Sequence, residues 1–247
     1  MTSKDPRRWW ALTAMSLAVF LVAVDGTVLS LATPSIVKDL QPTASQVLWI
    51  GDIYSFVLAG LLITMGNVGD RVGRKRLLLI GGTAFALISI PAAYSSTAEQ
   101  LIFFRALMGV AGATLMPSTL ALMRSTFSDP AERSFAIGVW SAMGAAGAAA
   151  GPLFGGILLQ NFWWGSVFLV NVPIMALVFV IGMPSLRESR DPNPGTLDVL
   201  SVGLSLVGII GVVYAVKELA IEGMATQYVA VGVIGVIAVT WFVRRQL

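Results

Sequence analysis

Long apolar runs separated by short polar turns extend along the whole chain. A helix that crosses a bilayer needs about 20 predominantly apolar residues, and the runs here have that length. They predict eight transmembrane helices, at residues 10–32, 46–66, 77–95, 100–123, 134–158, 164–184, 198–217 and 226–243. We therefore expect an all-α membrane protein.

A cluster of turn residues divides these spans into two groups. The run Arg190–Gly195 contains two prolines, an asparagine and a glycine, which favour turns and loops. We expect residues 1–189 to form a six-helix bundle, residues 190–196 to form a cytoplasmic linker, and residues 197–247 to form a separate pair of transmembrane helices.

The composition agrees with a membrane protein and excludes several chemistries. Hydrophobic residues make up 56% of the 247 residues and charged residues only 12%, against about 25% charged residues in a soluble domain. The sequence has no cysteine and no histidine, so disulfide frameworks, Cys/His metal sites and histidine acid–base catalysis are excluded. The sequence also shows no nucleophile–base pair and no phosphate-binding loop, and we expect no enzymatic activity.

The positive charges are distributed on one side of the predicted membrane protein. If the N-terminus is cytoplasmic, all but three of the 16 Lys and Arg residues lie in cytoplasmic segments; Lys38 and Lys217 lie outside, and Arg105 lies within a span. Such an excess is typical of cytoplasmic loops. We therefore expect a multi-pass protein of the cell membrane with both termini in the cytoplasm. Because the charge faces the inner leaflet, the net charge of +3 does not indicate nucleic-acid binding.

Three charged residues interrupt the apolar runs: Asp25, Asp52 and Arg105. All three are expected in the outer part of the membrane, where they could face a common cavity. Charge inside a bilayer is costly and usually functional, and a carboxylate in a low-dielectric site can exchange a proton near neutral pH. The pattern predicts a proton or cation site. The structural alternative is that Asp25 caps a kink beside Gly26 and that Asp52 bonds Tyr54 or a neighbouring helix.

Glycines recur along the fifth span. Gly147, Gly151 and Gly155 are four residues apart and share one helix face, with Gly138 earlier in the span and Pro152 beside Gly151. Small residues at this spacing let another backbone approach closely, and a proline inside a helix can bend it. Ordinary glycine-mediated packing, without a functional role, is the alternative.

A short basic turn lies between the second and third spans. Residues 66–76 contain three glycines, one aspartate and four basic residues. This turn resembles the signature loop between helices two and three of the major facilitator superfamily. In that superfamily the loop helps to latch the cytoplasmic face against the C-terminal bundle. The resemblance implies a gating role for Gly66, Asp70, Arg71, Gly73 and Arg74.

Other segments resemble further motifs of the same superfamily. Leu101–Gly109 is similar to its helix-four arginine motif, which implies that Arg105 takes part in proton coupling. The glycine pattern of the fifth span is similar to the antiporter motif of the drug-efflux branches. That motif would comprise Gly138, Gly147, Gly151, Pro152 and Gly155.

Two segments resemble one branch, the drug:proton antiporters with fourteen spans. They are Asp25–Val28 followed by Pro34, and Phe168–Pro173. The resemblance is to multidrug pumps that export quaternary ammonium compounds and fluoroquinolones, and it implies that Asp25 and Asp52 act in cation recognition or coupling. Asn171 and Pro173 fit the pattern without an assigned role. The sequence departs from the branch at Trp163–Gly165, where an arginine is more usual.

The resemblance implies a proton-coupled efflux transporter that exports lipophilic cationic drugs and dyes. The proton gradient would supply the energy, and no cofactor is expected. Apolar and aromatic contacts plus a carboxylate would hold the drug. The implied partners are small-molecule drugs and dyes, the lipid bilayer and a C-terminal transporter bundle. A major facilitator porter for another small molecule and a non-transporting truncated membrane protein remain alternatives.

A pump of the fourteen-span branch contains two six-helix bundles with a two-helix insert between them. Residues 1–189 match the N-terminal bundle and residues 197–247 match the insert, so the C-terminal bundle would follow Leu247. Alternating access needs two halves, so we expect this chain not to transport alone. It would be either a fragment of a longer pump or a protein that needs a partner. We also expect the gating loop to lack the C-terminal bundle against which it would latch, and the glycine face of the fifth span to lose a packing partner as well.

Overall fold

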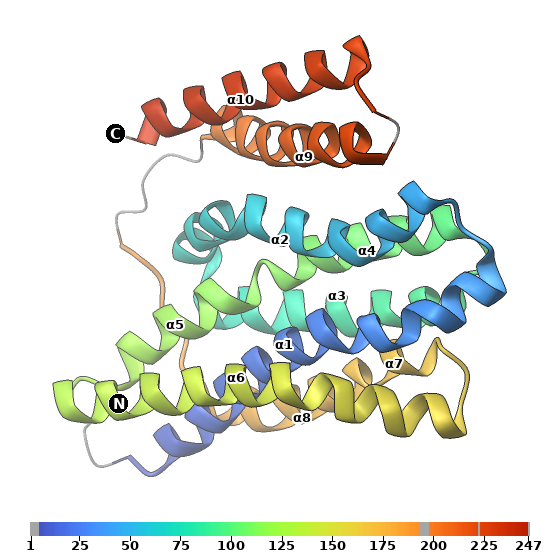
Figure 1. Cartoon of the computed structure of the whole chain (residues 1–247). Coiled ribbons are helices and arrows are strands. Elements are labelled where there is room, and N and C mark those ends of the chain that lie inside the picture. The colour runs from blue at the N-terminus through green and yellow to red at the C-terminus, as the bar shows by residue number, and fades with distance from the viewer. Residues whose placement is uncertain (1–4, 193–197, 222, 247) are drawn as a thin grey trace.

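The computed structural model describes residues 5–192, 198–221 and 223–246, and this part of the chain is helical almost throughout (Figure 1). The predicted linker at residues 190–196 lies largely outside the described residues. The helices are α1 Arg7–Leu40, α2 Ala44–Val72, α3 Arg74–Ala93, α4 Ala98–Gly112, α5 Leu115–Thr126, α6 Pro130–Asn161, α7 Ser166–Leu169, α8 Asn171–Ser185, α9 Val199–Ile221 and α10 Thr226–Gln246.

The eight predicted spans are confirmed. Within the described ranges, 8 helical segments are long and apolar enough to cross a membrane. The fourth span is α4 followed by α5, and the sixth is α7 followed by α8. Helix α1 has 34 residues and is therefore about 50 Å long, which exceeds a hydrocarbon core of about 30 Å.

Polar residues in the turns set where several of these helices begin. Thr43 precedes α2 and forms a capping box, in which the backbone N–H of Gln46 donates to Thr43 Oγ1 over 3.2 Å and Thr43 N donates to Gln46 Oε1 over 2.8 Å. Thr97 caps α4, and Asp129 caps α6 just before a proline at its first position. These caps satisfy backbone donors that a helix N-terminus leaves free.

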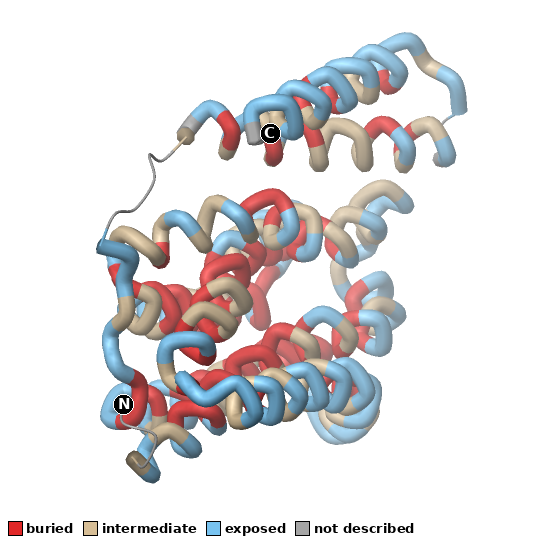
Figure 2. Tube along the Cα trace, turned by 90° about the vertical axis from the view of Figure 1, so that its left-hand side faces the viewer, coloured by how far each residue is buried: buried red, intermediate tan, exposed pale blue. Residues whose placement is uncertain are grey.

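The first six spans form one bundle with α1 at its centre, and α9 and α10 lie together along one side of it (Figure 1). Large apolar side chains such as Met15, Phe85 and Phe168 are fully buried inside the bundle. The outward faces of the bundle are exposed (Figure 2). They are also apolar, as the exposed side chains of Ile80 and Leu153 illustrate. Because lipid is as apolar as the interior, burial of apolar area does little to hold these helices together, and close packing and polar contacts become decisive.

The glycine face of α6 supplies such close packing. A Cβ atom on Gly147 would lie 2.6 Å from the carbonyl oxygen of Phe20 in α1, and one on Gly155 would lie 3.3 Å from Leu31 Cβ. Helix α6 continues through Pro152, which is exposed. The expectation that this glycine face lacks a packing partner is therefore wrong, because α1 of the same bundle covers it.

Gly138 is different from the other glycines of this motif. It is exposed, and a Cβ atom built there meets nothing within 4 Å. The resemblance groups Gly138 with the glycines that touch α1, but only Gly147, Gly151 and Gly155 are buried.

The helices α9 and α10 form a pair that contacts the bundle through α2. Glycines bring the two helices close, since a Cβ atom on Gly235 would lie 2.7 Å from the backbone nitrogen of Val212. Arg245, near the C-terminal end of α10, forms an ion pair with Asp198, just before α9, with 2.9 Å between Nη2 and Oδ2. Hydrogen bonds from Ser201 and then from Arg245 lower the pKa of Asp198 to about 2.

The two glycine environments give a matched prediction. Gly147→Ala places a methyl group against the backbone of α1, so we expect it to destabilise the protein by about 1–3 kcal/mol and to lower its thermal unfolding temperature in detergent. Gly138→Ala is the control, because it adds a methyl group to open space and should leave that temperature nearly unchanged. Equal unfolding temperatures for the two variants would contradict the close packing of α6 on α1.

Candidate functional site

An ion pair between Asp25 of α1 and Arg105 of α4 lies inside the bundle. Arg105 Nη1 is 2.7 Å from Asp25 Oδ2, and the side chains of Arg105 and Asp25 are 1% and 0% exposed. Of the three charges expected to face a common cavity, Asp25 and Arg105 therefore lie together. Removing one partner from such a pair leaves a buried charge without compensation, which costs about 3–5 kcal/mol.

The guanidinium of Arg105 has several further contacts. Its Nε donates to the carbonyl of Ile50 over 3.3 Å and its Nη2 to the carbonyl of Gly51 over 3.5 Å, both in α2. The guanidinium carbon also lies 4.6 Å from the ring centroid of Tyr54 and 5.9 Å from that of Phe168. The backbone carbonyls and the faces of these rings offset part of the cost of burying the cation.

The second oxygen of Asp25 is bound by Asn171, the first residue of α8. Asn171 Nδ2 donates to Asp25 Oδ1 over 2.8 Å and to Ser89 Oγ of α3 over 3.1 Å. Ser89 in turn donates to the carbonyl of Phe85 over 2.8 Å. The buried polar cluster, meaning Asp25, Ser89, Arg105 and Asn171, therefore joins four spans.

Sequence reasoning missed two members of this cluster. Asn171 was assigned no role, and Ser89 was not singled out. Asn171 did carry a signal, because it is a polar residue in an apolar run, as Asp25 is. Ser89 carried no such signal, because a serine in a membrane helix commonly bonds its own backbone.

Asp52 does not belong to the buried polar cluster. Its carboxylate lies 2.5 Å from Lys217 Nζ of α9, and its side chain is 47% exposed. The expectation that all three intramembrane charges face one cavity is therefore wrong for Asp52. The reason is helix phase: Tyr54 is on the buried face of α2, and two residues correspond to about 200° around a helix.

Lys217 links α9 to α2 by more than this ion pair. Lys217 Nζ also donates to the carbonyl of Leu48 over 3.0 Å and lies 5.7 Å from the ring centroid of Trp49. The neighbouring Glu218 is buried and accepts a hydrogen bond from Ser45 over 2.6 Å. Lys217 and Glu218 thus fix α9 against the first part of α2.

The predicted gating loop makes the turn from α2 into α3. Gly73 has φ of 115°, a conformation that favours glycine. Arg74 forms an ion pair with Asp70, 2.8 Å between Nη2 and Oδ1. Arg71 lies in the last turn of α2, and a Cβ atom on Gly66 would make ordinary contact with Pro117 at 3.7 Å.

Glu188, in the segment after α8, caps the N-terminus of α3. The backbone N–H groups of Lys75 and Arg76 each donate to its carboxylate over 3.1 Å. A carboxylate there satisfies free donors and complements the helix dipole. A Cβ atom on Gly73 would lie 2.6 Å from the same carboxylate, and the φ of 115° at this position already favours glycine. Sequence reasoning did not identify Glu188.

Backbone contacts join the same two segments. The N–H of Arg74 donates to the carbonyl of Ser189 and that of Asp191 to the carbonyl of Asp70, both over 2.9 Å. Within the described residues, the gating loop therefore packs against residues 188–191, and its contact with a C-terminal bundle stays a prediction. Whether the loop gates transport stays a prediction.

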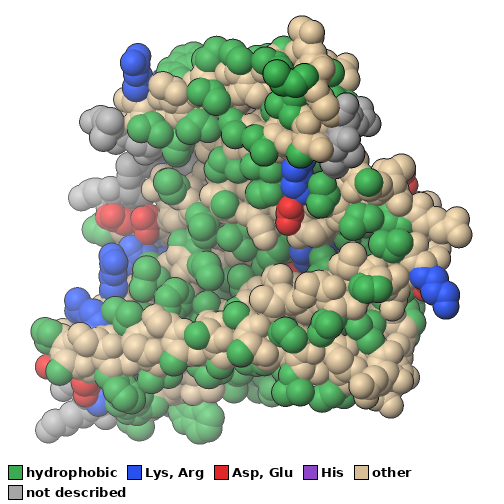
Figure 3. Space-filling model, viewed as in Figure 1, with side chains coloured by type: hydrophobic (Ala, Val, Ile, Leu, Met, Phe, Trp, Pro, Cys, Tyr) green, Lys and Arg blue, Asp and Glu red, His purple; other side chains and the backbone are tan. Residues whose placement is uncertain are grey.

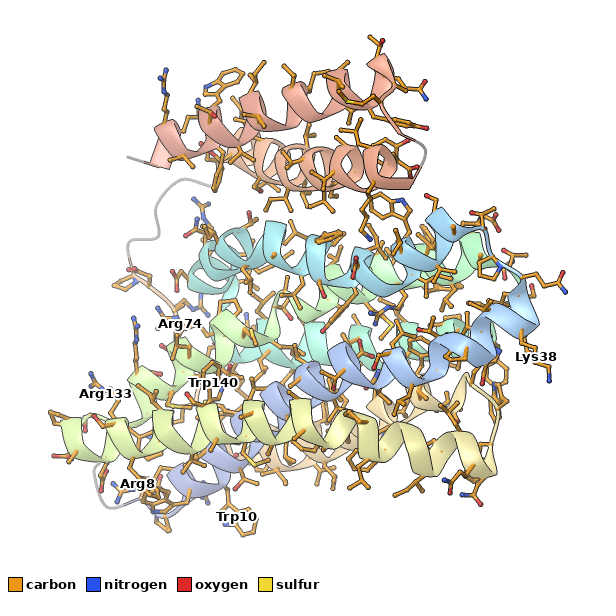
Figure 4. The ribbon with its side chains drawn as sticks, in the orientation of Figure 1. Arg8, Trp10, Lys38, Arg74, Arg133 and Trp140 are labelled. Atoms are coloured by element: carbon orange, nitrogen blue, oxygen red, sulfur yellow. The ribbon has the colours of Figure 1, made fainter. Side chains whose placement is uncertain are left out.

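Cationic side chains mark one end of the bundle. Arg8, Arg74 and Arg133 lie toward the same end of the molecule, and Lys38 lies at the opposite end (Figure 4). In the space-filling view, hydrophobic side chains cover much of the face, and Lys and Arg gather mainly toward that first end (Figure 3). Among the described residues there is no group of three His, Cys, Asp or Glu side chains that could hold a metal ion.

Comparison with known proteins matches the Major Facilitator Superfamily over residues 15–245. Multidrug efflux pump LfrA of Mycolicibacterium smegmatis is 49% identical over 246 residues, covering 99% of this chain and 49% of LfrA. Methyl viologen resistance protein SmvA of Salmonella typhimurium is 41% identical over 243 residues, covering 98% of this chain and 49% of SmvA. The chain therefore spans about half the length of these curated relatives.

The fold agrees with this match. The crystal structure of a bacterial homolog to the human lysosomal transporter Spinster, inward-facing and occupied, superposes with a TM-score of 0.63 at 19% identity, over 95% of this chain and 58% of that one. At such identity the likeness shows the fold alone. Together with the family match and the two relatives, it establishes that this chain belongs to the Major Facilitator Superfamily.

Proposed function

We propose that the chain forms one half of a proton-coupled multidrug efflux transporter that exports lipophilic cations. The observation that carries this proposal is the ion pair between Asp25 and Arg105, at 2.7 Å in the interior of a membrane bundle. Buried ionisable residues in membrane spans mark ion pathways and proton relays. The export of drugs is supported by the relatives, which are named for multidrug efflux and for resistance to methyl viologen.

Asp25 acts in this proposal as the proton carrier and not as a ligand of the drug. Its side chain is 0% exposed and both of its oxygens accept hydrogen bonds, so no oxygen is free for a cationic drug in this conformation. A proton on Asp25 would remove its charge and weaken its hold on Arg105. Asp25, Arg105 and Asn171 come from three spans, so this change would alter how α1, α4 and α8 pack together.

Two of those spans contain breaks where such a change could be absorbed. Helix α4 ends at Gly112 and α5 begins at Leu115, and α7 ends at Leu169, two residues before Asn171. We infer that Arg105 and Asn171 are carried on short helical segments that can shift without moving the whole span. Breaks in membrane helices are tolerated where neighbouring helices bury them.

The cationic end of the bundle is proposed to face the cytoplasm. Arg8, Arg74 and Arg133 lie toward that end, and cytoplasmic segments carry an excess of positive charge. This orientation puts both the gating loop and the N-terminus of α1 at the inner surface of the cell membrane. The residues on the opposite side, near Lys38, would then face outward.

Transport is proposed to require a second six-helix bundle, on the same polypeptide or on another. Alternating access depends on two halves that rock about a central site, and the first six spans would form one such half. The helices α9 and α10 would be the insert between the halves. The gating loop, with its cap at Glu188, would then contact the second bundle at the cytoplasmic surface.

Export of an antibiotic is a second candidate function. A tetracenomycin C resistance and export protein of Streptomyces glaucescens is 38% identical over 199 residues, and puromycin resistance protein pur8 of Streptomyces alboniger is 37% identical over 215 residues. Comparing export of a lipophilic cation with export of a neutral drug separates the two candidates.

The need for a second bundle can be tested by reconstitution. We expect the 247-residue chain in liposomes to move no cationic dye in response to a proton gradient. A chimera that joins the chain to the part of LfrA that it does not cover should move the dye, and a protonophore should stop it. Proton-driven flux by the chain alone would refute the requirement for two bundles.

The role of Asp25 can be tested in the same chimera. Asp25→Asn removes the proton-binding carboxylate, so we expect proton-driven export of cationic and neutral drugs alike to fall by about 100-fold or more, the effect typical of losing a group that transfers a proton. Asp25→Glu keeps a carboxylate and should retain part of the export. Asp39→Asn, the same change at an exposed position of α1, is the matched control. A selective loss of cation export would instead indicate that Asp25 binds the drug.

Asp52 is proposed to position α9 and not to bind a drug. Asp52→Asn leaves Lys217 poorly solvated, since its side chain is only 14% exposed, so this variant should unfold at a lower temperature. Lys217→Met should lower the unfolding temperature less, because the carboxylate of Asp52 that it leaves unpaired is half exposed and can be solvated by water. In the double variant most of the loss should be recovered, with a coupling of about 0.5–3 kcal/mol. If the losses of stability in the two single variants simply added in the double variant, this role would be contradicted. It would also be contradicted if Asp52→Asn lowered export and the double variant did not restore that export.

A further inference from the structure

The carboxamide of Asn171 is bonded on one side only. Asn171 is 0% exposed, and its Nδ2 donates to Asp25 Oδ1 over 2.8 Å and to Ser89 Oγ over 3.1 Å. Its Oδ1 is buried and has no hydrogen-bond partner among the described residues. Leaving a buried acceptor without a partner is unfavourable, so this orientation needs an explanation.

The charge of Asp25 supplies that explanation. An ionised carboxylate only accepts hydrogen bonds, whereas a protonated one also donates. While Asp25 is ionised, Asn171 must turn its amino group toward Oδ1, and its own oxygen is left in the apolar interior. Once Oδ1 carries a proton, the two facing groups would both be donors, and the present orientation would become unfavourable.

We propose that Asn171 is a positioning residue whose carboxamide reverses when Asp25 gains or loses a proton. In the protonated state the amide turns about its Cβ–Cγ bond, and its Oδ1 accepts the hydrogen bond from Asp25. The hydroxyl of Ser89, which now donates to the carbonyl of Phe85, can turn to donate to the same Oδ1. This inference rests on the proposed function in taking Asp25 as the proton site.

Of the two side chains that bond Asp25, Arg105 and Asn171, only Asn171 has an atom that can accept a hydrogen bond. Arg105, from α4, faces the other oxygen of Asp25 and offers only donors. The ring of Tyr54, from α2, stacks on the guanidinium of Arg105, and its centroid lies 4.6 Å from the guanidinium carbon. The carboxylate and guanidinium of α6 are bonded elsewhere, Glu132 to Arg8 and Arg133 to the carbonyl of Phe127. Helices α5 and α7 contribute no charged side chain to the hydrogen bonds and ion pairs that the structure gives Asp25.

The reversal can be observed directly in the intact chain. The sequence has four asparagines, Asn67, Asn161, Asn171 and Asn193, so a sample labelled with ¹⁵N only at asparagine gives four side-chain amide signals. Asn171→Ser removes and thereby assigns one of them. In lipid nanodiscs titrated from about pH 9 to about pH 4, we expect the Asn171 amide protons to leave the low-field position typical of a bond to a carboxylate, in a single sigmoidal step.

Two controls separate the reversal from a general effect of pH. The amide of Asn161 donates to the carbonyl of Ile157 over 2.8 Å at the end of α6, so its signal should not move. In Asp25→Asn, which has nothing to titrate at position 25, the Asn171 signal should become independent of pH. A pH-independent Asn171 signal in the unaltered chain, or a step that persists in Asp25→Asn, would overturn the proposal.

This test is independent of transport. It needs no drug and no second bundle, so a chimera that fails to export would refute the proposed function and leave the reversal standing. Conversely, proton-driven export without any change in the Asn171 signal would support the function and refute the reversal.

Discussion

The contact between Asp25 and Arg105 is the constraint on which the bundle depends. It places two opposite charges 2.7 Å apart in an interior that water does not reach. Each charge is tolerable only while the other is present and while Asn171, Tyr54 and the carbonyls of α2 surround them. Because those partners come from different spans, the ion pair requires α1, α2, α4 and α8 to meet at one point.

Close backbone packing supports the same arrangement from the other side of α1. The buried glycines of α6 let α1 approach so closely that the carbonyl of Phe20 and the side chains of Thr27 and Leu31 take the space that a Cβ atom on α6 would need. In lipid this contact matters more than apolar burial, because the outer faces of the helices are as apolar as the inner faces. The gating loop is fixed by a third device, in which the carboxylate of Glu188 occupies the N-terminus of α3 and the space that a side chain at Gly73 would fill.

Span count and span length could be predicted from the sequence, because hydropathy fixes which segments cross a bilayer. The sequence also indicated that Asp25, Asp52 and Arg105 lie at a similar depth, but not that Asp25 and Arg105 pair with each other. Asp52 shows the limit of that reasoning. Its depth follows from its place in the span, but the direction of its side chain depends on which face of α2 packs inward. Asn171 and Glu188 were not assigned their contacts because each bonds a segment far away in the sequence, Asn171 reaching Asp25 and Glu188 reaching the start of α3.

The sequence by itself determined that the protein is an all-α membrane protein with eight spans, a one-sided distribution of positive charge and a resemblance to one transporter superfamily. These properties depend on the composition and order of residues along the chain, because each segment partitions between lipid and water according to its own hydropathy and charge. Only the tertiary structure decided which charges meet, that α1 covers the glycine face of α6, and that the segment after α8 holds the gating loop. Those contacts depend on the rotation of each helix about its axis, which packing against its neighbours sets.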